Sequence, residues 1–414
     1  MTVSTPSTVA LDLRADFPIL GREINGGRLV YLDSSSTSQK PASVLAALDD
    51  YYRNHNANIH RGVYLLAQEA DALFEGARAR IAAFLRWPAA NTIFTRNVTE
   101  AINLVAYSWA RTNLRPGDAV LISEMEHHSN IVPWQLATQA TGAELRYLEV
   151  TEDGTLSLDQ LDRELARGDV ALVALTHVSN VLGTINPVAE IVRRAHGAGA
   201  LALIDGAQAV PQLAVDLTEI DADFYAWTGH KALGPTGVGV LHARAELLEQ
   251  MPPFLAGGDM IATVEAQHST WNELPWKFEA GTSMIAQAIG LGAAIDYLDA
   301  LGMARVRAHE HALTAYALEH LRGLAGVSVF GPQSADERGG VVSFALAGIH
   351  PHDVAELLSR TNVCIRASHH CAQPLMRRLG VNATARASFG PYNVAADVDA
   401  LLDAVADAQE VFAG

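Results

Sequence analysis

Residues 224–237 read FYAWTGHKALGPTG and place Lys231 in a polar turn. The apolar run 224–227 predicts a buried strand, and a loop rich in Gly and Pro follows the turn. Side chains just beyond a strand end lie where ligands bind in α/β proteins. Lys231 is a candidate amine nucleophile, because Lys40 and Lys277 are the only other lysines in the chain. Taken alone, the same pattern also fits an exposed lysine in an ordinary loop.

Alternating strands and helices surround this stretch. Strands are expected at 92–95, 119–122, 144–150, 170–175, 200–204, 224–227 and 237–241, and helices at 99–110, 131–140, 158–167 and 187–197. Several of these strands are apolar throughout, as burial on both faces of a mostly parallel sheet requires. The alternation indicates an α/β fold. A polar stretch, 260–275, predicts an ordered loop, and the residues after 301 predict a smaller α/β unit that includes a strand at 363–367.

The overall composition excludes several classes of protein. Of the 414 residues, 49% are hydrophobic and 18% are charged, which indicates a large buried core. A net charge of -17 argues against nucleic-acid binding, which needs a basic surface. No apolar run reaches the ~18–20 residues that cross a membrane. The N-terminal residues lack the pattern of a signal peptide and the chain has only 2 cysteines, so we expect a cytoplasmic protein.

Several of the expected loops carry polar side chains at strand ends. Thr99 opens the expected helix 99–110, and helix N-termini bind phosphate groups. His127 lies in a loop with a second histidine, where an imidazole can stack on an aromatic ring or shuttle a proton. Asn180 and Asp205 also follow strands, and a carboxylate there suits the pyridinium nitrogen of pyridoxal phosphate. Simple helix capping is the alternative role for Thr99 and Asp205.

The last part of the sequence adds a second group of reactive residues. Residues 364–376, CIRASHHCAQPLM, bring Arg366 and Cys371 into one loop before an expected helix. Cys364 falls within an apolar strand and is expected to be a core residue. Arg386 lies in a half-buried strand, where its planar guanidinium suits a carboxylate. A zinc site is the alternative for the His and Cys residues, but no ligand set has zinc-like spacing, so we expect no metal.

The order of these groups along the chain resembles one family. The matching motifs are MEHHSNIVPWQ, THVSNVLGT, DGAQAV, TGHKALGPTG, GGDMIATV, FEAGT and RASHHCAQPLM. From about residue 11 to its end the chain resembles aminotransferase class V enzymes of pyridoxal-phosphate fold-type I, and more closely SufS-type (group II) cysteine desulfurases. The resemblance implies an α/β fold with a mostly parallel seven-stranded sheet between helices. It also implies a large cofactor domain, 30–295, and a small domain of residues 1–29 and 296–414 with the cysteine loop.

The same resemblance implies a role for each residue. Lys231 carries the internal Schiff base of pyridoxal phosphate and then moves protons, His127 stacks on the pyridine ring, and Cys371 attacks the substrate sulfur and becomes a persulfide. The other implied contacts are to the ring and phosphate from Thr99, Asp205, Gln208, Thr228 and His230, to the phosphate of the neighbouring subunit of a homodimer from Thr282, and to the substrate from His60, Asn180, Arg366 and Arg386. Ser368 stands where related sequences often have glycine, which would reduce the freedom of the cysteine loop.

The resemblance therefore predicts a cysteine desulfurase that converts L-cysteine to L-alanine. Its sulfur is expected to serve iron–sulfur cluster assembly through an acceptor protein of the SufE or SufU type. A selenocysteine lyase acting on L-selenocysteine, or a sulfur donor for a thio-cofactor or natural product, would share these motifs. An epimerase or a kynureninase-like hydrolase would not need Cys371, and a scaffold without catalysis would not need every reactive group.

Overall fold

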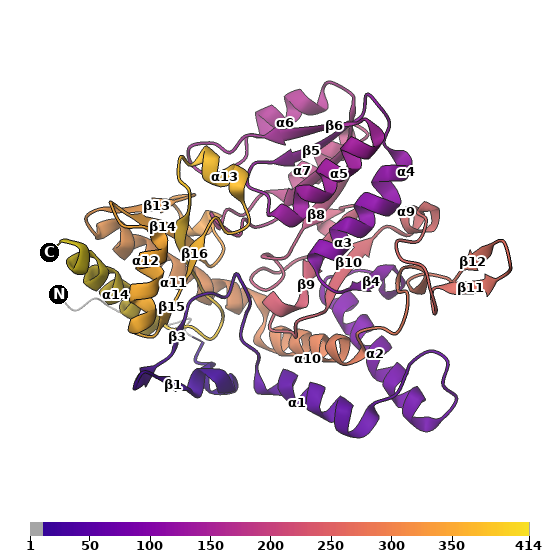
Figure 1. The fold of residues 1–414 in the computed structure, drawn as a ribbon, viewed down its shortest axis with the longest axis horizontal. Helices are drawn as coiled ribbons and strands as arrows, with labels where there is room; N and C mark the ends of the chain where they lie inside the picture. Colours follow the sequence, from indigo (N-terminus) through magenta and orange to yellow (C-terminus); the bar gives the residue numbers. More distant parts are fainter. Residues whose placement is uncertain (1–10, 414) are drawn as a thin grey trace.

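A seven-stranded sheet forms the centre of the computed structural model, which describes residues 11–413 (Figure 1). Residues 1–10 of the predicted segment 1–29 lie outside the described residues. The strand order is β4-β10-β9-β8-β7-β5-β6, and only β10 runs antiparallel to its neighbours. The strands are β4 (Thr92–Thr95), β5 (Ala119–Ser123), β6 (Glu144–Leu148), β7 (Val170–Thr176), β8 (Leu201–Asp205), β9 (Phe224–Thr228) and β10 (Gly239–Ala243).

Both faces of this sheet are buried, as its apolar strands predict. Successive residues of β9 alternate between two cores, because neighbouring side chains of a strand point to opposite faces. Phe224 and Ala226 belong to one core, and Tyr225 and Trp227 belong to the other. The predicted mostly parallel sheet of an α/β fold is confirmed.

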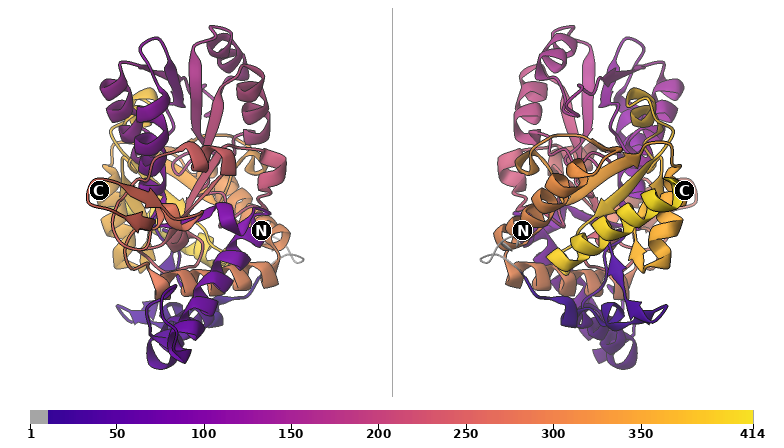
Figure 2. Two further views of the ribbon diagram at one scale, coloured as in Figure 1. Left: turned by 90° about the vertical axis from the view of Figure 1, so that its right-hand side faces the viewer. Right: turned by 90° about the vertical axis from the view of Figure 1, so that its left-hand side faces the viewer.

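Helices cover the two faces of the sheet (Figure 2). One face packs against α3 (Val98–Val105), which continues as a π-helical turn, Ala106–Ala110, and against α5 (Val132–Thr141). The other face packs against helices that include α2 (Leu65–Phe84), α6 (Leu158–Leu165), α7 (Val188–Gly197) and α10 (Ile285–Leu301). The other helices of this part are α1 (Ala42–Asp50), α4 (Arg111–Asn113), α8 (Leu217–Ile220) and α9 (Ala245–Gln250).

The C-terminal part forms a smaller α/β unit with its own core. Its antiparallel sheet has the order β13-β14-β17-β16. The strands are β13 (Val327–Phe330), β14 (Val341–Leu346), β16 (Arg366–Ser368) and β17 (Thr384–Ser388). Helices α11 (Met303–Gly323), α12 (Pro351–Arg360) and α14 (Ala395–Ala413) contribute to this core, whereas α13 (Gln373–Arg378) packs on the core of the central sheet. The cysteine loop, which precedes α13, therefore connects the two parts.

The expected strand 363–367 is two strands in different sheets. The first, β15 (Val363–Cys364), pairs in parallel with β3 (Val30–Tyr31), and the second is β16. Through this pairing Val30 and Leu32 join the core of the smaller unit. The N-terminal residues also form a small hairpin, β1 (Glu23–Ile24) and β2 (Gly27–Arg28). The domain boundaries at 29/30 and 295/296 stay a prediction.

The expected loop 260–275 contains a β-hairpin. Its strands, β11 (Ile261–Val264) and β12 (Ser269–Trp271), project from the right-hand side of the molecule in Figure 1. Most of their side chains are exposed, so the polar sequence lacks the apolar alternation that marks a half-buried strand. The prediction of an irregular loop was therefore wrong.

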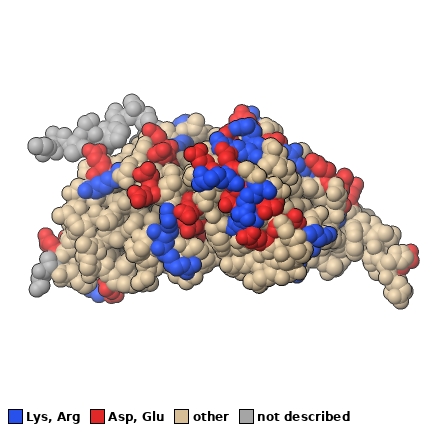
Figure 3. Space-filling view, turned by 90° about the horizontal axis from the view of Figure 1, so that it is seen from above, with Lys and Arg blue, Asp and Glu red and all other residues tan. Residues whose placement is uncertain are grey.

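The surface charge and the helices bear on two partners that the composition argues against, nucleic acid and the membrane. On the face drawn in Figure 3, Lys and Arg side chains alternate with Asp and Glu side chains rather than forming a separate basic region. Among residues 11–413, no helix has the length and apolar character needed to span a membrane. In the same residues, no three His, Cys, Asp or Glu side chains gather closely enough to hold a metal ion.

Candidate active site

A cavity of about 250 Å³ lies at the carboxyl ends of the central strands. Loops after β4, β5, β7 and β9 meet there, because parallel strands end at one edge of a sheet. Residues of β16, β17 and the loop before α13 close the other side. The predicted site residues that line it are Thr99, His127, Asn180, Thr228, His230, Lys231, Arg366, Cys371 and Arg386.

One end of the cavity is the N-terminus of α3. The side-chain oxygen of Asn97 caps this helix by accepting a hydrogen bond of 3.0 Å from the Glu100 N–H. Val98 and Thr99 also line the cavity, and the first N–H groups of a helix have no acceptor within it. Beside them lies the buried Thr228 hydroxyl, which has no hydrogen-bond partner among the described residues. These groups together suit an anion such as phosphate.

Gly239 of β10 allows the loop before α3 to come close to the sheet. A Cβ atom at this position would lie 2.6 Å from the Asn97 Cα atom, far inside normal van der Waals contact. Because the clashing atoms belong to the backbone, the loop itself would have to move. The absence of a side chain at Gly239 therefore permits the observed position of the helix N-terminus.

Asp205 and Lys231 follow neighbouring strands and interact electrostatically. Asp205 ends β8, is 3% exposed, and accepts a hydrogen bond of 2.9 Å from the Ala207 N–H at Oδ1. Burial raises the pKa of the Asp205 carboxyl, and the Lys231 amine opposes this rise. Burial lowers the pKa of Lys231 to about 8, against the opposing effect of Asp205. An amine with this pKa is partly neutral near pH 7–8, so it suits both nucleophilic attack and reversible proton transfer.

The His127 ring is held in one orientation and is neutral. Its Nδ1 atom accepts the Ser129 N–H at 3.1 Å and lies 2.7 Å from the Ser129 hydroxyl. Since Nδ1 is the acceptor, the proton of the neutral ring is on Nε2. Burial, together with Lys231 and other nearby cations, lowers the pKa of His127 to about 3. A neutral imidazole of fixed orientation suits stacking on an aromatic ring.

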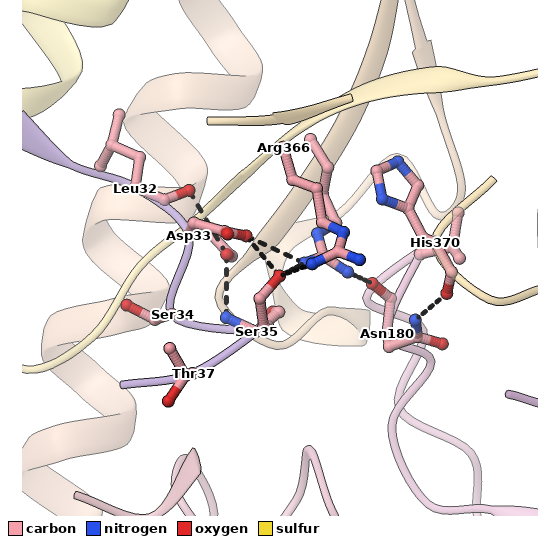
Figure 4. A network of polar contacts seen from close by, with 12 residues as sticks. Leu32, Asp33, Ser34, Ser35, Thr37, Asn180, Arg366 and His370 are labelled. Carbon is pink, nitrogen blue, oxygen red and sulfur yellow. Dashed lines mark hydrogen bonds and ion pairs between the residues drawn. The ribbon is translucent and has the colours of Figure 1, made fainter. Parts of the chain in front are cut away.

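Arg386 donates hydrogen bonds to residues from both parts of the chain, and Figure 4 shows two of these partners, Asp33 and Asn180, together with Arg366. Its Nη1 donates to the Asn180 carbonyl at 2.8 Å, and its Nη2 donates to Asp33 Oδ1 at 3.1 Å and to the Ser36 hydroxyl at 2.8 Å. Arg366 donates to the same Ser36 hydroxyl at 3.0 Å. The Arg386 Nε atom is buried and has no partner among residues 11–413. The network keeps two guanidinium groups at the cavity with donors available for a carboxylate.

The loop that carries Cys371 is tied to the central sheet by backbone groups. The Cys371 carbonyl accepts the His128 N–H at 2.7 Å, and the His370 carbonyl accepts the Asn180 side-chain amide at 2.8 Å. The Cys371 N–H donates to His369 Nδ1 at 3.1 Å. His370 and Cys371 have φ angles of 51° and 56°, a left-handed conformation that non-glycine residues adopt only when their surroundings require it. The backbone position of Cys371 is thus set by both parts of the chain.

Comparison with known proteins gives a consistent result. The sequence profile of the family "Aminotransferase class-V" matches residues 30–401. The chain belongs to the aminotransferase class V family. A probable cysteine desulfurase of Halalkalibacterium halodurans is 51% identical over 404 residues, which are 97% of this chain and 98% of the relative. A cysteine desulfurase of Haloferax volcanii is 46% identical over 415 residues, which are 97% of each chain.

Two solved structures of cysteine desulfurases share the fold of this chain. The cysteine desulfurase CsdA of Escherichia coli superimposes with a TM-score of 0.89 at 39% identity, covering 96% of this chain and 98% of that one. The apo cysteine desulfurase of Thermococcus onnurineus gives a TM-score of 0.91 at 36% identity and covers 100% of each chain. The predicted resemblance to class V enzymes is therefore confirmed, whereas the SufS-type subgroup stays a prediction.

The remaining predicted site residues of this class V chain lie outside the cavity. Asp205 is buried and does not line the cavity, and Gln208 lines a small neighbouring cavity with Lys231 while donating to the Ser35 carbonyl at 2.8 Å. Thr282 is exposed. His60 lines a separate cavity of about 280 Å³ and lies 3.1 Å from a Glu75 carboxylate oxygen. A single chain thus does not bring Thr282 or His60 to Lys231.

Several class V site residues were not found from the sequence. Asp33, Ser36 and Asn97 take part in the contacts described above. Residues 34–38 follow an apolar run as a stretch of Ser and Thr, which indicates a polar loop. The sequence does not show which of these hydroxyl groups contacts Arg386 and which stabilise helix caps or turns.

Proposed function

We propose that the chain is a pyridoxal-phosphate-dependent cysteine desulfurase, which converts L-cysteine to L-alanine and forms a persulfide on Cys371. The observation that carries this proposal is that Lys231 and Cys371, from different parts of the fold, line one cavity. Relatives that share about half of their residues with this chain are named probable cysteine desulfurases. Without Cys371 the cavity would suit many reactions of the same cofactor, so the thiol determines the class of reaction.

The residues of the cavity fit pyridoxal phosphate. The α3 N-terminus with Thr99, the unpaired Thr228 hydroxyl and His230 suit the phosphate, and Lys231 suits the carbonyl group. His127 suits one face of the ring, Asp205 its nitrogen and Gln208 its phenolic oxygen. When bound, the cofactor withdraws electrons from the bonds at the substrate α-carbon.

The side chains around the substrate bind and orient it and move protons. Asn180, Arg366 and Arg386 hold its carboxylate, which fixes the direction in which its sulfur points. The Lys231 amine, whose pKa burial lowers to about 8, takes and returns protons at the substrate carbons.

Cys371 performs the sulfur transfer. Its thiolate attacks the sulfur of bound cysteine, a sulfur–sulfur bond forms, and the bond from that sulfur to the substrate β-carbon breaks. The electron pair of the broken bond stays with the carbon skeleton, which takes up a proton and leaves as alanine. The persulfide on Cys371 retains the sulfur, so thiol and substrate together balance the reaction without an external oxidant.

Alanine release from cysteine tests the proposal. Wild type and Cys364→Ala release alanine and accumulate persulfide, whereas Cys371→Ala does neither. Cys364 is the matched control because it is the only other cysteine and lies in β15, away from the cavity lining. Full alanine release by Cys371→Ala contradicts the proposed mechanism.

A homodimer accounts for the residues that one chain leaves outside the cavity. Val63, Tyr64 and Leu65 are 90%, 56% and 69% exposed, a run of apolar side chains typical of a contact surface. We propose that a second copy covers this surface and that Thr282 and His60 then reach the partner's cavity. Coexpression of Cys371→Ala with Thr282→Ala tests this, since a mixed dimer retains one complete site while each single variant has none. Val63→Ser with Leu65→Ser is expected to yield monomers in size-exclusion chromatography.

The proposed persulfide also needs a recipient. Sulfur for iron–sulfur cluster assembly, passed to an acceptor of the SufE or SufU type, is the proposed use. A selenocysteine lyase or a donor for another thio-cofactor is distinguished by comparing turnover of L-cysteine and L-selenocysteine with and without such an acceptor. Stimulation of cysteine turnover by the acceptor supports the proposal, and turnover of L-selenocysteine alone contradicts it.

A further inference from the structure

The carbonyl group of His230, next to Lys231 in the chain, receives an unusual number of donors. The Ser38 N–H lies 3.0 Å from this oxygen, the Thr37 hydroxyl 3.1 Å, the Ser38 hydroxyl 3.1 Å and the Lys40 ammonium 2.9 Å. All of these donors come from residues 37–40, which precede the turn by about 190 residues in sequence. A carbonyl oxygen ordinarily accepts one or two hydrogen bonds.

In the turn that carries Lys231, neither the Leu233 N–H nor the Gly234 N–H donates to the His230 carbonyl. In a continuing helix, the N–H of Leu233 or Gly234 would bond to the His230 oxygen. Here Leu233 has a φ of 60°, so its N–H turns to the Ser38 hydroxyl at 2.9 Å, and the Gly234 N–H bonds to the Gly229 carbonyl instead. Ser38 therefore joins two backbone groups that a helical turn would join directly.

Lys40 supplies the fourth donor of this contact. Besides the His230 carbonyl it contacts the Ser38 carbonyl, and no carboxylate lies within ion-pair distance of it among residues 11–413. Burial lowers the pKa of Lys40 to about 7. Burying an ammonium without a carboxylate is unfavourable, so the carbonyl contacts are the favourable interactions that the site offers.

We propose that Ser38 and Lys40 form a clamp on the His230 carbonyl that positions Lys231, with Lys40 as a positioning residue for the reaction. The clamp acts from outside the active-site cavity, because neither residue lines it. The proposal rests on the function proposed for Lys231. Small displacements of a reacting amine reduce turnover strongly, whereas they leave the carboxylate contacts of the substrate intact.

The matched pair Lys40→Met and Lys277→Met tests the clamp. Lys277 is buried and, like Lys40, donates to two backbone carbonyls, those of Leu248 and Glu249, but it does not line the cavity. In the holoenzyme, Lys40→Met is expected to lower kcat about 10- to 100-fold with KM within about twofold of wild type. Amide hydrogen exchange in residues 229–234 is expected to accelerate at least about tenfold. Lys277→Met changes neither quantity.

Two further variants keep the proposal falsifiable if Lys40→Met fails to fold. Ser38→Ala removes the bridging hydroxyl and is expected to accelerate exchange in the same segment, and Lys40→Arg, which keeps the cation, is expected to restore part of kcat. The clamp is refuted if kcat and the exchange of residues 229–234 stay within about twofold of wild type. Activity of Lys231→Ala would refute the proposed function instead, and the exchange measurement would still decide whether the clamp exists.

Discussion

Replacement of Thr228 by valine is predicted to have opposite effects on the chain and on its cofactor complex. The Thr228 side chain is 1% exposed, and its hydroxyl has no partner among the described residues. Valine has the same shape and also suits a strand end, so the substitution removes an unpaired buried hydroxyl and creates no cavity. The free energy of unfolding of the apo chain is expected to rise by about 1 kcal/mol. A charge-assisted hydrogen bond to phosphate, worth about 1.5–3 kcal/mol, is lost, which weakens pyridoxal phosphate binding about 10- to 150-fold.

Thr92→Val is the matched control for this prediction. The Thr92 hydroxyl is also buried, but it bonds to the Pro88 carbonyl at 3.0 Å and to His242 Nδ1 at 3.1 Å. Its loss is expected to destabilise the chain by about 1–3 kcal/mol and to leave cofactor affinity unchanged. Urea unfolding of the apo variants measures the first quantity, and titration with pyridoxal phosphate measures the second. If Thr228→Val neither weakens pyridoxal phosphate binding nor raises the stability of the apo chain, the Thr228 hydroxyl does not serve to bind an anion.

Three further predictions concern the same region. Gly239→Ala places a methyl group 2.6 Å from the Asn97 Cα atom and is expected to reduce cofactor affinity at least about tenfold in the same titration, whereas unchanged affinity would show that the loop can move freely. Arg386→Lys loses the planar fork and is expected to raise KM for cysteine about tenfold or more with a smaller effect on kcat, and an unchanged KM argues against carboxylate binding there. Burial lowers the pKa of His242 to about 3, so the unfolded chain gains a proton at this residue near pH 6.5 and the folded chain does not. The free energy of unfolding therefore falls as pH drops below about 6.5, and this residue contributes up to ~1.4 kcal/mol per pH unit to the fall. In His242→Gln, the fall measured by urea unfolding between pH 6 and 4.5 is expected to be smaller by that contribution.

The central sheet was predictable because burial on both faces leaves a strong sequence signal. Runs such as 119–122 and 224–227 contain no polar residue, and the structure places strands at Ala119–Ser123 and Phe224–Thr228. Strands that are not buried on both faces lack this apolar sequence signal. The hairpin of β11 and β12 projects from the molecule, so its residues show no alternation, and the short β15 is defined by pairing with β3, more than 300 residues away in sequence.

Several residues that line the cavity could be named from the sequence, but the contacts that hold them in place could not. Lys231, Cys371 and Arg386 lie in sequence motifs whose residue types indicate their chemistry. Asp33 has no such motif, because its contact with Arg386 depends on a fold that brings residues 353 positions apart together. Lys40 lies in a segment without recognisable cofactor partners, and its contact is to a backbone carbonyl, which any residue at position 230 would supply. A contact to a backbone group does not depend on the side chain of the residue that supplies the group, so the sequence does not reveal the contact.

The anchoring of the cysteine loop limits how sulfur can leave the site. Cys371 and His370 are tied through their carbonyls to His128 and Asn180, which follow the strands β5 and β7 of the central sheet. Withdrawal of the loop would break these bonds and expose their donors, at about 1 kcal/mol or more for each bond. Rotation about the Cys371 side chain breaks none of them. For the proposed sulfur transfer it follows that the acceptor has to bring its own thiol to the mouth of the cavity, because the persulfide moves only within the reach of one side chain.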